Sequence, residues 1–160
     1  MASRRKGRIL AFQALYSWGT FYSQTGNPSI PEGLLDFSWV EWDKPLQEPM
    51  DEEMLTFSRL LVTGTTENIV PIDKMIERHL ENWELNRLNK VDLAVLRMSV
   101  YSLMFQTDIH PSIVIDEAID IAKEFGGDDS YRFVNGVLDS VRKTLQPEPK
   151  PEISGTPIAK

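Results

Sequence analysis

The stretch FGGDDSYRFVNG has the side chains that recognition of an unpaired nucleic acid strand requires. Aromatic rings stack on unpaired bases, while guanidinium, carboxamide and free backbone N–H groups bond to base edges. An alternative is a capped helix start whose aromatic rings belong to the core. The candidate RNA-binding residues that this chemistry indicates are Phe125, Tyr131, Arg132, Phe133 and Asn135.

A second candidate site is the basic N-terminus, formed by Arg4, Arg5, Lys6 and Arg8. No acidic residue precedes Glu32, although the formal net charge of the 160-residue chain is −7. An acidic protein with one basic corner can bind an anion locally and still resist indiscriminate binding to nucleic acid. The corner also coincides with the positive end of a predicted helix, which favours an anion there. The alternative is a solvated basic tail.

Catalytic chemistry has little support in the sequence. The chain has no cysteine and only two histidines, His79 and His110, which lie far apart in sequence. Neither a thiolate nucleophile nor a cysteine-based zinc site can therefore form, and a transition-metal site is disfavoured. No glycine-rich phosphate loop or nucleophile elbow is present. We predict a protein that is not an enzyme and needs no cofactor or metal.

Acidic residues cluster at Asp116, Glu117 and Asp120. The same spacing suits a polar helix face with one acid turned inward. Arg97 lies among apolar residues, where a guanidinium needs a charged, hydrogen-bonding partner. We predict that Glu117 is this partner, in a structural ion pair; a catalytic acid is the alternative.

The element that must position these groups is the stretch 91–105, VDLAVLRMSVYSLMF, which is apolar on most sides. We predict a buried central helix, with Asn89 as its N-cap and Asp92 in its first turn. At about 1.5 Å per residue it is too short to span a bilayer, and Arg97 interrupts it.

Helical periodicity recurs along most of the chain, and no alternating run is long enough for a sheet. Gly64 should mark a close approach of two helices, and Gly126 with Gly127 should end a helix with positive φ. The fold predicted is all-α, a compact bundle of about six to seven helices around the central one. The other helices are expected at 4–23, 51–68, 71–83, 111–125 and 131–145, the last capped by residues 128–130.

Residues 24–50 combine prolines and glycines with tryptophans and leucines. We expect a long connection with one short helical turn, packed on the bundle by its aromatic rings. Base stacking is the alternative, but neighbouring acidic residues would repel phosphate. We predict a single helical domain over 1–146 with this insertion, followed by a disordered tail over 147–160. The absence of cysteines and of a signal-like N-terminus favours the cytoplasm.

Three blocks of the sequence resemble the bacterial transcription antitermination protein NusB family. They are ALYSW at 14–18, VDLAVLRMSVYSL at 91–103 and VIDEAIDIAKEFGGDDSYRFVNGVLD at 114–139. The resemblance implies a small all-helical, non-enzymatic protein. It further implies a heterodimer with the ribosomal protein NusE that binds the boxA element of nascent RNA and promotes transcription of ribosomal RNA operons.

Carried over by motif, the resemblance implies roles for individual residues. Arg4, Arg5, Lys6 and Arg8 would form an arginine-rich RNA-binding end, and Phe125, Asp129 and Phe133 the second half of the RNA surface. Tyr16 and Asp92 resemble positions that face NusE. The acidic body of the chain implies that a partner supplying positive charge strengthens RNA binding.

The sequence is compatible with other hypotheses about function. One is a helical protein-interaction domain without intrinsic RNA binding, like the domain that precedes a methyltransferase in some RNA-modifying enzymes. Another is a small hydrolase using Asp116 and Glu117, for which we find no metal or nucleophile. A homodimer could mask the RNA surface. The RNA-binding reading requires the basic corner and the aromatic turn to lie side by side.

Overall fold

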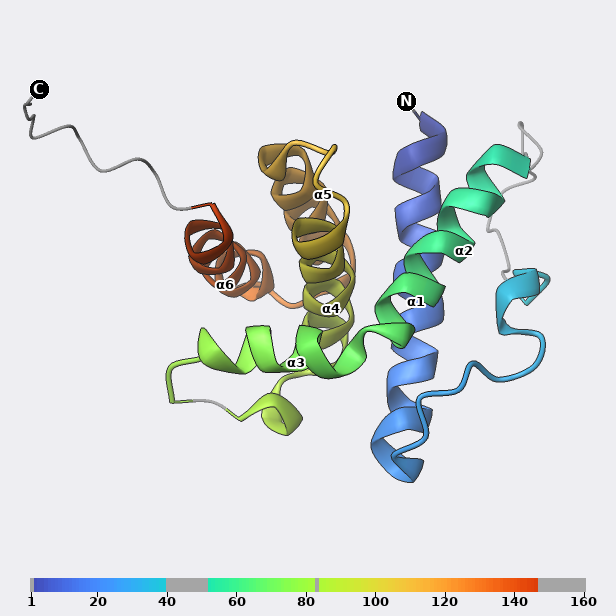
Figure 1. Ribbon diagram of the computed structural model, residues 1–160, viewed down its shortest axis with the longest axis horizontal. Coiled ribbons are helices and arrows are strands. Elements are labelled where there is room, and N and C mark those ends of the chain that lie inside the picture. The colour runs from blue at the N-terminus through green and yellow to red at the C-terminus, as the bar shows by residue number, and fades with distance from the viewer. Residues whose placement is uncertain (1, 40–51, 83, 147–160) are drawn as a thin grey trace, which may run out of the picture.

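The computed structural model describes residues 2–39, 52–82 and 84–146 (Figure 1). In these residues the chain forms six α-helices, two short 3-10 turns and no strand, which confirms the predicted all-α class. The helices are α1 (Ala2–Thr25), α2 (Glu52–Glu67), α3 (Ile69–Arg78), α4 (Lys90–Phe105), α5 (Pro111–Phe125) and α6 (Ser130–Leu145). The 3-10 turns are η1 (Leu34–Asp36) and η2 (Leu85–Arg87).

Helix α4 is the centre of the bundle, as its sequence predicts. It packs against each of the other five helices, and its residues from 94 to 103 are buried. Asn89 is its N-cap, because the Asn89 side chain accepts a hydrogen bond from the backbone N–H of Asp92 at 2.8 Å. Burial of an apolar helix on most sides accounts for most of its stability.

Gly64 lies where α2 approaches α4. A Cβ atom added at Gly64 would overlap the ring of Tyr101 on α4, so only glycine permits this packing distance. The predicted close approach is therefore confirmed.

The ends of two helices differ from the prediction. Pro71 lies in the first turn of α3, as predicted, but the helix ends at Arg78, five residues short of the predicted end at residue 83. Gly126 follows α5 with φ −96°, so the predicted positive φ is wrong. Glycine is needed at 126 for space instead, since an added Cβ would lie 2.6 Å from the Ser130 side chain.

The connection after α1 packs on the bundle through aromatic residues. Phe37 is fully buried next to the η1 turn, and the Trp18 indole donates a hydrogen bond to the carbonyl of Pro28 at 3.1 Å. Structural packing is thus confirmed for residues up to 39. The rest of the predicted insertion, 40–50, and the predicted disordered tail, 147–160, lie outside the described residues. None of the helices described is both long and apolar enough to cross a membrane.

Candidate nucleic-acid interface

Three residues at helical spacing form a stripe along α1, namely Arg5, Phe12 and Tyr16; we call them the α1 stripe. Spacings of seven and four residues place them on one face of the helix. The ring of Phe12 lies 5.2 Å, centroid to centroid, from the ring of Phe125 at the end of α5. Tyr16, one turn further along, is exposed.

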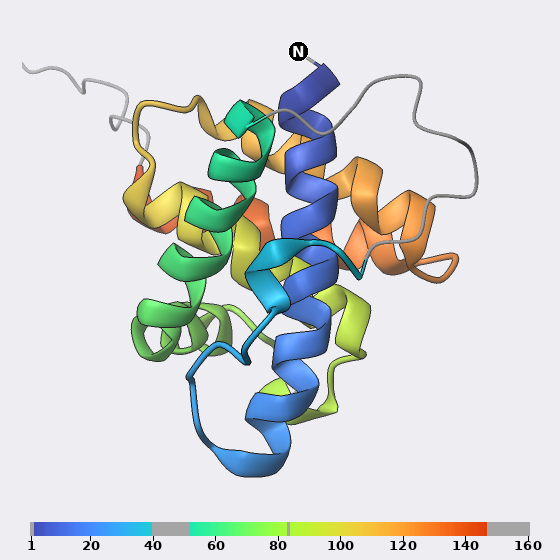
Figure 2. The ribbon, with the colours of Figure 1, turned by 90° about the vertical axis from the view of Figure 1, so that its right-hand side faces the viewer.

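Arg5 joins the same stripe to α5. Its Nη1 atom donates a hydrogen bond to Asp120 Oδ2 at 2.9 Å and lies 3.8 Å from Glu117 Oε2. The hydrogen bond to Asp120 raises the pKa of Arg5. In Figure 2, α5 crosses behind the N-terminal half of α1, and the α5–α6 turn emerges to the right of α1. The basic corner and the aromatic turn therefore lie on one side of the molecule, as the RNA-binding reading requires.

The basic corner itself divides between two neighbouring helices. Arg4 and Arg8 both face α2, with their guanidinium carbons 4.4 and 5.3 Å from the centre of the Phe57 ring. Arg8 is buried, and burial lowers its pKa although Glu117 opposes that change. Arg4 and Arg5 are exposed and Lys6 is partly exposed. Arg4, Arg5 and Lys6 thus remain accessible to a ligand, whereas Arg8 belongs to the packing of α1 on α2.

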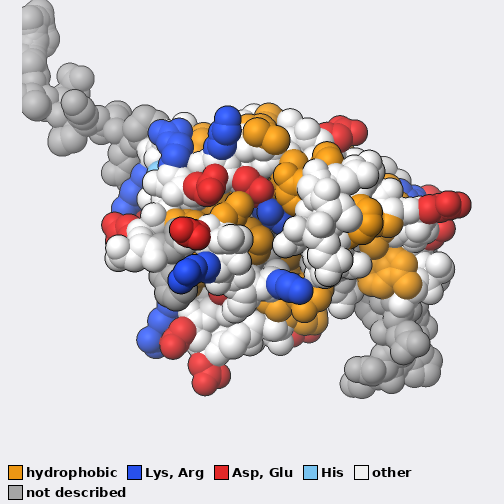
Figure 3. Space-filling view, turned by 90° about the horizontal axis from the view of Figure 1, so that it is seen from below, with side chains coloured by type: hydrophobic (Ala, Val, Ile, Leu, Met, Phe, Trp, Pro, Cys, Tyr) orange, Lys and Arg blue, Asp and Glu red, His pale blue; other side chains and the backbone are white. Residues whose placement is uncertain are grey.

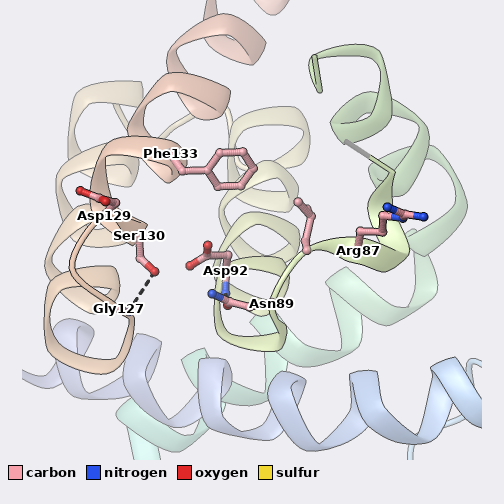
Figure 4. A pocket seen from close by; sticks show the side chains of 8 residues that line it. Arg87, Asn89, Asp92, Gly127, Asp129, Ser130 and Phe133 are labelled. Carbon is pink, nitrogen blue, oxygen red and sulfur yellow. Dashed lines mark hydrogen bonds between the residues drawn. The ribbon is translucent and has the colours of Figure 1, made fainter. Parts of the chain in front are cut away.

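A pocket of about 430 Å³ opens where the start of α4 meets the α5–α6 turn; we call it the Asp92 pocket (Figure 4). Figure 4 shows the Asp92 carboxylate and the Ser130 hydroxyl pointing toward one another, with the ring of Phe133 above them. Arg87 and Asp129 also line the pocket but direct their charged groups away from it. The pocket therefore presents a carboxylate and an aromatic ring to a ligand.

Asp92 is 7% exposed, and its Oδ1 atom is the one buried side-chain polar atom without a hydrogen-bond partner in the described part of the chain. Burial raises the pKa of Asp92, while a hydrogen bond from Ser130 acts in the opposite direction. An unsatisfied buried acceptor costs about 1–3 kcal/mol. An unsatisfied buried polar group in a native fold is uncommon and needs a specific explanation.

The remaining predicted residues of the turn have separate environments. Phe125 is partly buried against Phe12, and Asn135 is exposed on α6. The Arg132 guanidinium donates to the Tyr131 hydroxyl at 3.0 Å and lies 4.0 Å from an Asp129 carboxylate oxygen. Asp129 is the N-cap residue of α6, within the predicted cap at 128–130, but its side chain makes no capping hydrogen bond. Ser130 Oγ accepts a hydrogen bond from the backbone N–H of Gly127 at 3.1 Å.

Sequence reasoning missed two residues of this surface, Asp120 and Arg87. Asp120 lies three residues after Glu117, so helical spacing could have identified both acids as partners of one cation. Arg87 lies in the irregular segment before α4, where no periodicity indicates its direction.

The predicted ion pair between Arg97 and Glu117 is wrong. Arg97 donates two hydrogen bonds to Asp73 on α3, from Nε to Oδ1 at 2.9 Å and from Nη2 to Oδ2 at 3.0 Å. Its guanidinium carbon also lies 5.6 Å from the Trp18 ring centre and 5.5 Å from that of Tyr22. Arg97 faces α3 and the C-terminal half of α1, whereas Glu117 faces the N-terminal end of α1.

The face around this ion pair carries charges of both signs. Arg97 and Asp73 line a hollow of about 600 Å³ together with residues of α1, η2 and α3, among them Glu77 and Glu84. The space-filling view of the face formed by these elements shows acidic and basic side chains interspersed with apolar ones (Figure 3). Among the described residues visible on that face, no patch of a single charge sign is present for a nucleic acid.

Both histidines have structural contacts. His110 is the N-cap of α5 and accepts a hydrogen bond from the backbone N–H of Ser112 at 3.1 Å. His79 contacts Ser140 and Thr144 on α6 through its two ring nitrogens, at 2.7 and 3.1 Å. Among the described residues, no three acids or histidines are arranged to hold a metal ion.

Comparison with known proteins supports the resemblance seen in the sequence. The NusB family model matches residues 5–143. The transcription antitermination protein NusB of Treponema denticola is 51% identical over 139 residues, which is 87% of this chain and 95% of that protein. The NusB protein of Treponema pallidum is 50% identical over 141 residues, or 88% of this chain and 93% of that protein.

Solved structures are similar over the same range. A structure of T. maritima NusB has a TM-score of 0.72 and 37% identity, and the match covers 88% of this chain and 90% of that one. A crystal structure of the antitermination factors NusB and NusE in complex with dsRNA has a TM-score of 0.70 and 25% identity, covering 90% and 98% of the two chains. The chain therefore belongs to the NusB family and is a non-enzymatic transcription antitermination factor.

Proposed function

We propose that this protein binds boxA-like single-stranded RNA of ribosomal RNA operon transcripts together with the ribosomal protein NusE, as part of the transcription elongation complex. The observation that carries this proposal is the contact of the α1 stripe with α5. Arg5 bonds Asp120, and Phe12 packs on Phe125, so basic and aromatic groups from distant parts of the sequence border one surface. A strand lying on this surface would meet Arg4, Arg5 and Lys6 first and the aromatic turn next.

We assign the Asp92 pocket and Tyr16 to the NusE-facing side of this surface. Tyr16 is exposed one helical turn from Phe12, and Asp92 has a free buried acceptor oxygen. A donor group from NusE would satisfy that oxygen. A basic partner would also offset the net charge of −7, which otherwise weakens phosphate binding. A related structure contains NusB, NusE and RNA together.

The proposed setting is the cytoplasm, where nascent ribosomal RNA is made. We assign the function to the helical domain over 1–146. Titrations of RNA with and without NusE determine whether RNA binding depends on NusE. Sedimentation of the free protein determines whether it is a monomer or a homodimer.

The test is a titration of labelled boxA-like single-stranded RNA with the full chain, with and without NusE, from about 50 to 200 mM salt. A duplex of the same sequence serves as a second ligand. The variant replaces Arg4, Arg5 and Lys6 with alanine and keeps Arg8, because Arg8 is buried. Its matched control removes three exposed cations elsewhere, Lys74, Arg78 and Lys143.

The expected result is a weaker complex for the first variant, with a salt slope smaller by about 2, since each phosphate contact contributes about 0.7 for a single strand. The control should change affinity only slightly, through net charge. Equal slopes for the two variants would contradict a role for the basic corner. Binding of NusE without binding of RNA would instead support a protein-interaction domain. The hydrogen bond between Arg5 and Asp120 favours this second function, because it occupies a cation of the basic corner.

A further inference from the structure

An apolar groove runs between α2 and the end of α4, at the opposite end of α4 from the Asp92 pocket. We call it the α2–α4 groove; it has a volume of about 710 Å³, and its apolar lining residues are Phe57, Leu60, Tyr101, Phe105 and Ile109. Figures 1 and 2 both place the start of α2, the N-terminal end of α1 and the α4–α5 connection at the same end of the molecule.

The groove exposes large apolar side chains to solvent. Leu60 is 48% exposed and Phe105 is 46% exposed, and the Phe105 ring stacks on Tyr101 with centroids 5.6 Å apart. Contiguous apolar surface of this kind is typical of a binding site, whereas single exposed leucines are ordinary. The exposed Leu60 on α2, facing the same groove as the two aromatic rings of α4, is the feature that needs a partner.

The charged residues that line the groove are mostly acidic. Glu52 and Glu53 lie in the first turn of α2, and Asp108 lies in the α4–α5 connection. Arg4 is the one cation among the lining residues of this groove, and its guanidinium lies over the Phe57 ring. The rim therefore carries a net negative charge around an apolar floor.

We propose that the α2–α4 groove binds an amphipathic, basic helix of a partner protein. An apolar helix face fits a hydrophobic groove, and flanking lysines or arginines complement the acidic rim. RNA and anionic membranes are disfavoured, because Glu52, Glu53 and Asp108 repel phosphate. A second copy of this acidic chain would bring like charges together. The same argument disfavours the chain's own residues 40–51, which hold four acids and one lysine.

The position of the groove separates it from the Asp92 pocket, which we assign to NusE. The Asp92 pocket lies at the start of α4 and the groove at its end, and a helix of 16 residues is about 24 Å long. The groove and the Asp92 pocket can therefore be occupied at once, whereas Arg4 borders both the groove and the basic corner. The groove would supply a further protein contact in an assembly, and this inference does not depend on the proposed RNA binding.

The probe is a labelled synthetic helix of about four turns, with leucines on one face and lysines on the other. A matched peptide carries glutamates in place of the lysines. Fluorescence anisotropy measures the binding of each peptide to the full chain and to two variants. The groove variant is Leu60→Gln with Phe105→Gln, and the control is Val70→Gln on α3, where Val70 is an apolar residue 57% exposed.

We expect the lysine peptide to bind at least about tenfold more tightly than the glutamate peptide, and the groove variant to lose about tenfold in affinity. Val70→Gln should bind like the unaltered chain. Replacement of Glu52 and Glu53 by glutamine should weaken binding of the lysine peptide and reduce its salt dependence. Replacement of Glu77 and Glu81, on the α3 side, should leave both unchanged.

Three results would overturn the proposal. The first is equal affinity for the lysine and glutamate peptides, or equal affinity of the lysine peptide for the unaltered chain and the groove variant. Either outcome would show that the groove is not a site for a basic helix. Self-association measured by sedimentation and abolished in the groove variant would assign the groove to a second copy. The third result is that neither peptide binds and that the groove variant has a lower free energy of unfolding than the unaltered chain. It would assign the groove to the chain's own residues 40–51.

Discussion

Phe12 on α1 packs against Phe125, the last residue of α5, with ring centroids 5.2 Å apart and ring planes tilted by 44°. The contact joins residues 113 positions apart in the sequence and ties the aromatic turn to the basic end of α1. Phe125 is partly buried, so part of its side chain is accessible to a ligand.

The first prediction concerns the exposed part of the Phe125 ring. Phe125→Leu should weaken binding of boxA-like RNA by at least about fivefold, since stacking of one base contributes about 1–3 kcal/mol. Its free energy of unfolding should fall by less than about 1.5 kcal/mol, because leucine keeps most of the packing on Phe12. Anisotropy and chemical denaturation measure the two effects. Phe21→Leu, at an exposed position on α1, is the control. Unchanged RNA affinity would make Phe125 a core residue only.

The second prediction concerns the acid that holds Arg5. Asp120→Asn should raise RNA affinity by about two- to fivefold, because it releases Arg5 from an exposed ion pair of at most about 1 kcal/mol. Asp116→Asn makes the same change in net charge on the exposed side of α5, and no contact with Arg5 is found there. Titrations at low salt measure both variants. An equal gain in both would attribute the effect to net charge alone.

The third prediction tests the partner of Arg97. Asp73→Asn leaves a buried guanidinium without its carboxylate and should lower the free energy of unfolding by about 3 kcal/mol. Glu117→Gln should change it by less than about 0.5 kcal/mol. Replacing the pair together, with Arg97→Met and Asp73→Leu, should restore much of the loss. Urea denaturation compares the three proteins, and a large loss for Glu117→Gln would refute the assignment.

The fourth prediction concerns the pH dependence of stability near Asp92. Burial raises the pKa of Asp92 above that of an unfolded chain, so the charged form destabilises the fold. At acidic pH, where Asp92 is protonated, the unaltered chain is therefore as stable as Asp92→Asn. Its free energy of unfolding falls relative to that variant as the pH rises through the pKa of Asp92 in the folded protein. At neutral pH the asparagine variant should be more stable by about 1 kcal/mol, and the difference should vanish below about pH 4.

Thermal unfolding across pH measures this difference, with Asp128→Asn, at an exposed position, as the control. The same Asp92→Asn variant should bind NusE more weakly, because the free Oδ1 atom would lose its acceptor charge. A stability difference that does not depend on pH would contradict a buried, charged Asp92.

The sequence by itself determined the helices and the centre of the bundle. The apolar residues of 91–105 cover most sides of a helix, so α4 had to be buried, and Asn89 followed by Asp92 marked its start. Gly64 within an apolar helix indicated a close approach, which Tyr101 makes. These features depend on the order of residues within one or two turns, and that order is visible in the sequence.

Only the tertiary structure decided which side chains meet across helices. Arg97 required an acid, and both Asp73 and Glu117 have suitable chemistry; the rotation of α4 about its axis directs Arg97 to Asp73. The basic residues of α1 likewise divide between Phe57 and Asp120, because α1 packs on α2 and α4 and reaches α5 only through single side chains such as Arg5. The unpaired oxygen of Asp92 arises because Ser130 and Phe133 enclose it from another helix. Contacts of this kind depend on the angle and separation between packed helices. The spacing of residues within a single helix does not specify that angle or separation.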